Sequence, residues 1–289
     1  MPSPRRSVFI SICLLPIICS SCETIDKVTG SIQRPTAEVK GVHLADLNLD
    51  SATLAFDVDV KNPYPVSLPL MNLDYGLASG GERFLSGEAD IQDVIPAQQS
   101  KVFSVPVNVR FTELLGVLTR VKPGSIVPYR ADLGLSVDAP KAGNLRLPMS
   151  TAGELPIPAI PDVKLEQIRW EELSLQAVEG VMRLEVVNRN EFPVDLSKLS
   201  YALSLSDMDV ASAGVNQQME LAGNGGSGVL EIPISFSARN LGLAAIKMLT
   251  GSDTLYELEG IIDTSTPFGP MTFPLDSKGN VPLKQDDSK

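Results

Sequence analysis

The chain has 289 residues, of which 43% are hydrophobic, and its formal net charge is −11. This length accommodates about two ordinary domains, and the apolar content excludes a globally disordered chain. An acidic chain without basic runs is a poor candidate for nucleic-acid binding. The 22 glycines and 22 prolines favour many short strands joined by turns over long helices.

Residues 1–21 are organised like a secretory signal peptide. Arg5 and Arg6 precede an almost wholly apolar stretch, residues 8–18. That stretch is too short to span a bilayer, which takes roughly 20 residues, and it fits the hydrophobic region of a signal peptide. We therefore expect the protein to be exported.

The end of this segment resembles the lipobox of bacterial lipoproteins, because the small residues Ser20 and Ser21 directly precede Cys22. The resemblance implies cleavage before Cys22, acylation of its thiol and anchoring in a membrane through lipid. Cys19 stands where a lipobox usually has an aliphatic residue, so an ordinary secreted protein with a free thiol is the alternative. Glu23 replaces the aspartate that typically retains lipoproteins in the inner membrane, so we expect the outer membrane, facing the periplasm.

A first domain is expected over residues 35–153, after a tether of residues 22–34. Its clearest strand alternates between polar positions and the apolar positions Leu54, Phe56, Val58 and Val60, so one face is buried and the other meets water. Residues 103–111 alternate likewise, and Pro106 predicts an edge strand or a bulge there. A short helix is expected to begin at Thr112 as its N-cap and to stop at Pro123-Gly124.

The second half of the chain repeats the first at an offset of about 126 residues. Asn62 corresponds to Asn188, and Pro106 to Pro233 at an offset of 127. The repeat predicts a second domain over residues 162–284, a proline-rich linker over 154–161 and a disordered tail over 285–289. Its counterpart of the short helix is expected over residues 240–250. The pattern predicts an all-β fold: two tandem antiparallel β-sandwiches, each with one short helix.

The turn after the first alternating strand reads Asn62-Pro63-Tyr64-Pro65-Val66-Ser67-Leu68. It resembles the water-stress and hypersensitive-response (WHy) domain of the late embryogenesis abundant (LEA) group 2 family. The second half keeps Asn188 and Phe192-Pro193 but has Arg189 in place of the first proline. The resemblance implies immunoglobulin- or fibronectin-III-like sandwiches, a role in desiccation and stress tolerance, and no catalytic residues.

Asn62 and Asn188 are the candidate site residues of this motif. Asparagine and proline both favour turns, through a side chain that mimics a backbone turn and through a fixed φ. We therefore interpret the motif as structural, tying down a turn beside the core. A binding role for the motif is the alternative.

Little else in the sequence suggests chemistry. His43 is the sole histidine, so a histidine-dependent triad or metal site would have to include it; we expect a surface residue. The glycine-rich residues 223–228 lack the strand-loop-helix context of a phosphate loop and are expected to form a hairpin loop or an exposed tip. Trp170 is expected in the core. No catalytic group, metal or cofactor is predicted.

The favoured interpretation is a non-enzymatic, membrane-anchored envelope lipoprotein acting in stress tolerance or as a protein-interaction module. Its expected partners are the membrane, through the N-terminal lipid, and envelope proteins. The prolines in both edge strands favour a monomer. The alternative is a periplasmic carrier of a lipid or another apolar ligand.

Overall fold

The computed structural model describes residues 33–140, 142–174, 176–237 and 249–285. The chain divides into two compact units, residues 1–34 and 35–289, and all the strands belong to the second unit. The expected signal peptide and Cys22 lie outside the described residues, as does nearly all of the helix expected over 240–250. Within the described part of the chain, no helix is long and apolar enough to cross a membrane.

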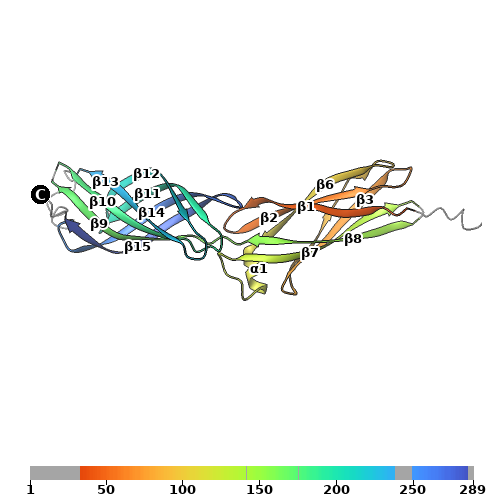
Figure 1. The fold of residues 1–289 in the computed structure, drawn as a ribbon, viewed down its shortest axis with the longest axis horizontal. Coiled ribbons are helices and arrows are strands. Elements are labelled where there is room, and N and C mark those ends of the chain that lie inside the picture. Colours follow the sequence, from red (N-terminus) through yellow and green to blue (C-terminus); the bar gives the residue numbers. More distant parts are fainter. Residues whose placement is uncertain (1–32, 141, 175, 238–248, 286–289) are drawn as a thin grey trace, which may run out of the picture. The chain divides into compact units, whose positions relative to one another are not determined.

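The first repeat forms two antiparallel sheets (Figure 1), in the orders β1-β2-β6 and β4-β3-β7-β8, with β5 paired to β3. Alternation of apolar and polar residues along the strands gives each sheet an apolar inner face, and these faces enclose the core. The elements are β1 (Thr36–Leu47), β2 (Ser51–Lys61), β3 (Leu68–Ser79), β4 (Glu82–Asp90), β5 (Val94–Ile95), β6 (Ser100–Arg110), α1 (Phe111–Val117), β7 (Ile126–Ala139) and β8 (Gly143–Pro156).

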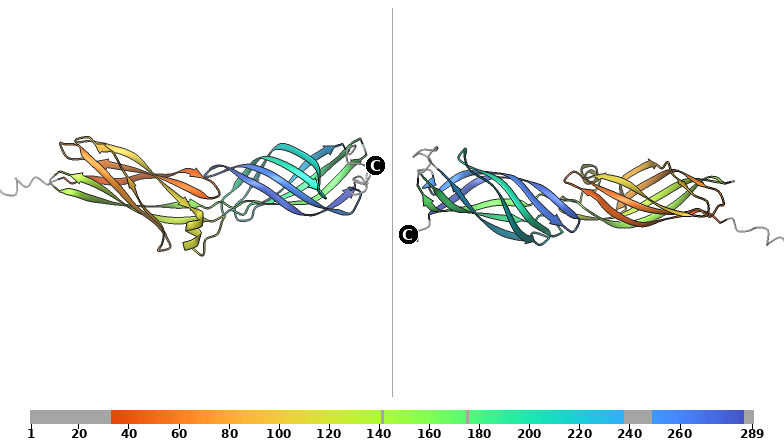
Figure 2. Two further views of the ribbon diagram at one scale, coloured as in Figure 1. Left: turned by 180° about the vertical axis from the view of Figure 1, so that it is seen from behind. Right: turned by 90° about the horizontal axis from the view of Figure 1, so that it is seen from above.

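The second repeat has the same succession of strands except for a counterpart of β5, and it has a core of its own. Figure 2 shows the strands of this domain and of the first from two further sides. Its strands follow the single order β12-β11-β14-β15-β9-β10-β13. They are β9 (Asp162–Leu173), β10 (Val178–Val187), β11 (Val194–Leu205), β12 (Met208–Leu221), β13 (Ser227–Phe236), β14 (Asp253–Thr266) and β15 (Gly269–Gln285).

The fold class predicted from the sequence is confirmed, and so are the inner faces of the strands. The apolar positions predicted to face inward on β2 are all buried: Leu54, Phe56, Val58 and Val60. Trp170 is buried as expected, and its ring packs against Phe236 in a T-shaped arrangement. The strands that carry Pro106 and Pro233 lie at the ends of their strand orders, as their missing N–H donors require.

Two local expectations were wrong. Helix α1 begins at Phe111 with Arg110 as N-cap, so Thr112 is not the cap, and the helix ends at Val117, well short of Pro123. The N–H of Phe111 donates to the carbonyl oxygen of Asp50. This backbone acceptor satisfies an N–H group that a capping side chain would otherwise bind. Strand β8 also runs on to Pro156, into the stretch expected to be linker.

The two repeats differ where their layers meet. In the second repeat, residues 283–285 of β15 pair in parallel with residues 168–170 of β9 and join the layers into one continuous sheet. In the first repeat, the equivalent strands β1 and β8 are neighbours, but no pairing joins them in the described residues. The repeat offset places Pro158 where the second repeat has Lys284, and a proline cannot donate to a strand partner. In the described part of the first domain, β8 therefore lies beside β1 without pairing to it.

Candidate functional site

Asn62 lies at the end of β2 and is 1% exposed. Its side-chain Nδ2 lies 2.8 Å from the carbonyl oxygen of Val66, 3.1 Å from that of Ile95 and 3.0 Å from that of Pro96. Its Oδ1 accepts the N–H of Tyr64 at 2.9 Å. One amide group thus joins the end of β2, the turn that follows it and the segment after β5.

Asn188 repeats this geometry in the second domain, where it is fully buried. Its Nδ2 lies 2.8 Å from the carbonyl oxygen of Phe192 and 3.1 Å from that of Ala222. Its Oδ1 accepts two hydrogen bonds from Asn190, one from the backbone N–H and one from Nδ2, both at 2.9 Å. We call the two arrangements, centred on Asn62 and Asn188, the asparagine clasps.

The glycine-rich residues 223–228 contact the second clasp and do not form a hairpin loop, although Asn224 and Gly225 are exposed as the alternative expectation had it. They join β12 to β13, which pair with different neighbours, and the N–H of Asn188 donates to the carbonyl oxygen of Gly226 at 2.9 Å. A Cβ at Gly223 would lie directly against the carbonyl oxygen of Glu191. Close approach of two backbone segments is therefore the reason for glycine here.

The other motif residues surround the clasps. Phe192 is buried and packs edge-on against Phe268, with ring centroids 5.2 Å apart. Tyr64 and Pro63 are half-buried, whereas Pro65 and Pro193 are exposed. In both copies, the asparagine amide is directed into the protein and bound to backbone carbonyl groups. Both polar atoms of each amide have partners within the protein and both side chains are buried, which favours the structural interpretation of the motif.

The second clasp also holds the segment between the two domains. The Oδ1 of Asn190 accepts the N–H of Ala159 at 2.7 Å, and its Nδ2 donates to the carbonyl oxygen of the same residue at 3.0 Å. Arg189, which replaces the proline of the first copy, forms an ion pair with Asp162 at the start of β9. The residues in which the second motif differs from the first therefore bind the linker, through Asn190, and the start of β9, through Arg189.

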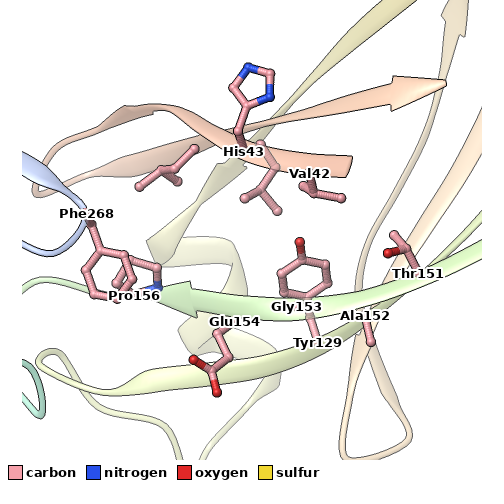
Figure 3. Close-up of a pocket in the computed structure, with 11 residues that line it drawn as sticks. Val42, His43, Tyr129, Thr151, Ala152, Gly153, Glu154, Pro156 and Phe268 are labelled. Atoms are coloured by element: carbon pink, nitrogen blue, oxygen red, sulfur yellow. The ribbon is translucent and has the colours of Figure 1, made fainter. Parts of the chain in front are cut away.

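A cavity of about 270 Å³ lies between β1 and β8 (Figure 3). It is lined by residues 42–44 of β1, Leu54 of β2, Tyr129 of β7, residues 151–154 and Pro156 of β8, and Phe268. The Tyr129 hydroxyl points toward β1, whereas the His43 ring points away from the cavity. Burial raises the pKa of the Tyr129 hydroxyl above its ordinary value.

The two repeats use this tyrosine differently. In the second repeat, the hydroxyl of Tyr256 accepts the N–H of Leu165 of β9 at 3.3 Å and lies 3.0 Å from Ser277 Oγ of β15. Tyr129 is its counterpart, yet in the described part of the first domain no hydrogen bond is formed by its hydroxyl. The repeat offset identifies the two tyrosines as counterparts. No residue near either tyrosine in the sequence indicates that their hydrogen bonds differ.

His43 is a surface residue, with a side chain 58% exposed and its Nδ1 3.3 Å from Asp57 Oδ2. Asp57 and Asp59 lie on the outer face of β2, half-buried beside β1. Over the described ranges, no group of three or more potential ligand side chains could hold a metal ion. The described acidic residues are instead distributed over the sheet faces and ion pairs.

Comparison with known proteins gives the family. The model of the Late embryogenesis abundant protein family (LEA_2) matches residues 57–153 and, again, residues 183–279. The chain belongs to the LEA_2 family. Each match covers most of one repeat and includes one clasp asparagine, so the duplication inferred from the sequence is a duplication of LEA_2 domains.

Several plant proteins resemble the chain over one such domain. The Late embryogenesis abundant protein Lea14-A of Gossypium hirsutum is 30% identical, over 48% of this chain and 91% of its own length. The Desiccation protectant protein Lea14 homolog of Glycine max is 31% identical, over 48% and 90%. The solution structure of a late embryogenesis abundant protein of Arabidopsis thaliana is 28% identical over 47% and 76%, with a TM-score of 0.38.

Proposed function

We propose that this protein is a non-enzymatic lipoprotein of the cell envelope, whose two LEA_2 domains protect neighbouring macromolecules during dehydration. The observation that carries the proposal is the match of both repeats to LEA_2, together with relatives named desiccation protectant or desiccation-related. The lipobox-like residues before Cys22 support an anchor, and Glu23 supports the outer membrane as its location.

The surface of the domains suits this role. The outward positions of the strands carry charged residues, many in exposed ion pairs such as Arg146–Asp74 and Lys101–Asp93. The net charge of −11 keeps such domains apart from one another and strongly hydrated. As water is withdrawn, charged and stably folded domains would act as spacers that keep unfolding neighbours from associating. This mechanism requires no catalytic group.

A drying assay tests the proposal. Residues 23–289 are mixed with a dehydration-sensitive enzyme, dried and rehydrated, and the recovered enzyme activity is measured. The control is an unrelated β-sandwich protein of similar size and net charge. We expect the LEA_2 protein to preserve activity at lower molar ratios than the control. Equal recovery with both proteins would contradict a specific protective role.

Carriage of an apolar ligand is the alternative function, and one observation bears on it. The cavity between β1 and β8, about 270 Å³, falls below the roughly 300–1,000 Å³ of ordinary ligand pockets, whereas hollows of about 390, 490 and 640 Å³ elsewhere on the described chain fall within that range. Native mass spectrometry of protein extracted gently from its own membrane distinguishes the two functions. A reproducible mass beyond residues 22–289 and their acyl chains would favour the carrier.

A further inference from the structure

Several apolar side chains are exposed around the first asparagine clasp. Pro69 of β3 and Val94 of β5 are paired neighbours on the outer face of their sheet, and Met71 lies at a bulge farther along β3. Val66, whose carbonyl oxygen is bound by Asn62, lies in the turn itself. Val66, Met71 and Val94 are 49%, 47% and 46% exposed, and Pro69 is exposed as well. We call Val66, Pro69, Met71 and Val94 the clasp patch.

The second domain has no such apolar surface at its own clasp. Each carbonyl group bound by Asn62 has a counterpart 126 residues later that is bound by Asn188, so this offset holds around both clasps. At this offset, the three patch positions on β3 and β5 correspond to the exposed polar residues Asp195, Ser197 and Glu220. Asp195 and Glu220 are again paired neighbours. The fold therefore does not require apolar residues at these positions, and their presence in the first domain needs another reason.

The first clasp lies at the end of the domain where β1 begins. Thr36, the first residue of β1, pairs with Lys61, which directly precedes Asn62. Residues 23–34 separate Cys22 from Pro35. An extended chain spans at most about 3.3–3.6 Å per residue, so a lipid on Cys22 would hold this end of the domain within about 45 Å of the bilayer.

The size and the charge of the clasp patch favour a lipid surface over a protein partner. Four exposed side chains offer far less than the roughly 800 Å² that each partner contributes to a stable protein interface. At a membrane a weak apolar contact suffices, because the tether makes the contact intramolecular. The surrounding charges are mixed, with Lys61 and the Lys101–Asp93 ion pair near the turn and Asp138 on the adjoining β7. A zwitterionic lipid surface suits this balance better than a strongly charged one.

We propose that the clasp patch inserts into the surface of the bilayer to which Cys22 is anchored, among zwitterionic phospholipid head groups. Its apolar side chains leave water for the boundary between head groups and acyl chains, where burial of apolar area is favourable. This inference rests on the lipid anchor of the proposed function and adds an orientation to it. The first domain stands on the membrane with its clasp end down, rather than moving freely on its tether.

The test supplies the anchor chemically, so its outcome does not depend on whether Cys22 is acylated in the cell. Cys22 is the only cysteine in residues 22–289, and it is coupled to a maleimide lipid in phosphatidylcholine vesicles whose acyl chains carry bromine. Bromine quenches tryptophan fluorescence on contact. We expect at least twofold quenching of the emission that Val66→Trp adds to the signal of the buried Trp170, relative to vesicles without bromine. No quenching would overturn the proposal.

Val117→Trp is the matched control. Val117 is 42% exposed in the same domain but lies on α1, which follows the end of β6 that pairs with Ser51, at the opposite end of β2 from Asn62. Its added emission should be the same in both kinds of vesicle. Equal quenching in the Val66 and Val117 variants would indicate unspecific adsorption and would overturn the proposal.

A patch reversal tests the residues themselves. Met71→Ser and Val94→Glu together introduce the residues of the second domain at exposed positions, so the protein should fold normally. Added to Val66→Trp, they should abolish the quenching, and full quenching would overturn the proposal. Sedimentation of the uncoupled protein covers the other occupant: a dimer that the reversal dissociates would assign the patch to a second copy of the chain and would likewise overturn it.

Discussion

Each asparagine clasp concentrates several buried hydrogen bonds on one side chain. Asn188 binds the carbonyl groups of Phe192, Leu221 and Ala222, and the last two lie 33 and 34 residues along the chain from Asn188. Leaving a buried polar group without its partner costs about 1–3 kcal/mol. The clasp therefore contributes to stability through groups that no apolar substitute could satisfy.

Asn188→Ala should destabilise the second domain by roughly 2–4 kcal/mol, since several buried groups lose their partner at once. Trp170, in the core of that domain, provides the signal: its fluorescence during urea unfolding should show a lower midpoint. Asn62→Ala is the matched control, because it breaks the equivalent clasp in the other core. It should leave the Trp170 transition in place, and a midpoint unmoved by Asn188→Ala would refute a structural role for the clasp.

Asp74 gives a pH-dependent contribution to the first domain. Arg146 Nε donates to its Oδ1 at 2.8 Å, and hydrogen bonding to Arg146 lowers the pKa of the Asp74 carboxyl below 3.8. A pKa lowered by folding contributes stability that is present above the ordinary pKa and is lost as the pH falls through the folded value. Both side chains are about half exposed, so the contribution is below about 1 kcal/mol.

Titration of Asp74 by NMR checks this sign. In the wild type, its pKa should lie below 3.8, and in Arg146→Gln it should rise toward that value. The stability difference between the two proteins should be present at neutral pH and shrink as the solution is acidified from about pH 4. An Asp74 pKa equal in both proteins would show that the ion pair does not form in solution.

At the scale of elements, the glycine-rich connection between β12 and β13 depends on its close approach to the Asn188 turn. A Cβ on Gly223 would also lie 2.7 Å from the carbonyl carbon of Glu191, which is nearer than real Cβ contacts allow. Gly223→Ala should therefore destabilise the second domain by about 1–3 kcal/mol, as overpacking does. Gly214→Ala on β12 is the control, since its Cβ would meet nothing nearer than 3.7 Å.

Trp170 fluorescence during urea unfolding again measures both variants. The midpoint should fall for Gly223→Ala and remain within error, or rise slightly, for Gly214→Ala, because alanine restricts the unfolded chain more than glycine does. If both variants behaved alike, the close packing between this connection and Glu191 would not determine the choice of glycine.

The strands could be predicted from the sequence because their signal is local. Alternation identified the buried face of β2, and Pro106 and Pro233 identified edge strands. The features that could not be predicted depend on distant residues: the glycine-rich connection receives Asn188 across more than 30 residues, and the first turn of α1 is held by the carbonyl group of Asp50. Such partners leave no periodic pattern in the sequence.

At the scale of the whole molecule, the two copies produced by duplication differ at the edge where the two layers of each domain meet. The parallel pairing of β15 with β9 joins the layers of the second domain, whereas among the described strands of the first domain β1 pairs only with β2. A repeat offset read from the sequence predicts equivalent strands but not whether their edges meet. Lys284 pairs with Arg169, whereas its counterpart Pro158 has no N–H to donate. This difference explains the missing pairing, but only after the structure has shown that residue 284 is paired.

The proposed membrane anchor also belongs to the scale of the whole molecule, and Cys22→Ala tests it. Without an acylated thiol, the protein should move from the membrane fraction to the soluble envelope fraction, because it would lose the apolar chains that hold it. Mass spectrometry of the wild type should show residues 22–289 with acyl chains. Unchanged membrane association of the variant, or an unmodified Cys22, would remove lipid anchoring from the proposed function.

The two clasps also differ in how they age. An asparagine side chain deamidates when the backbone nitrogen of the next residue attacks its amide carbon and a cyclic imide forms. Asn62 is followed by Pro63, whose ring nitrogen carries no hydrogen and cannot complete this reaction. Asn188 is followed by Arg189 and lacks that protection. Over long storage, the Asn62 amide is therefore protected from this reaction by the covalent structure of the chain. The Asn188 amide is protected only while the second domain stays folded.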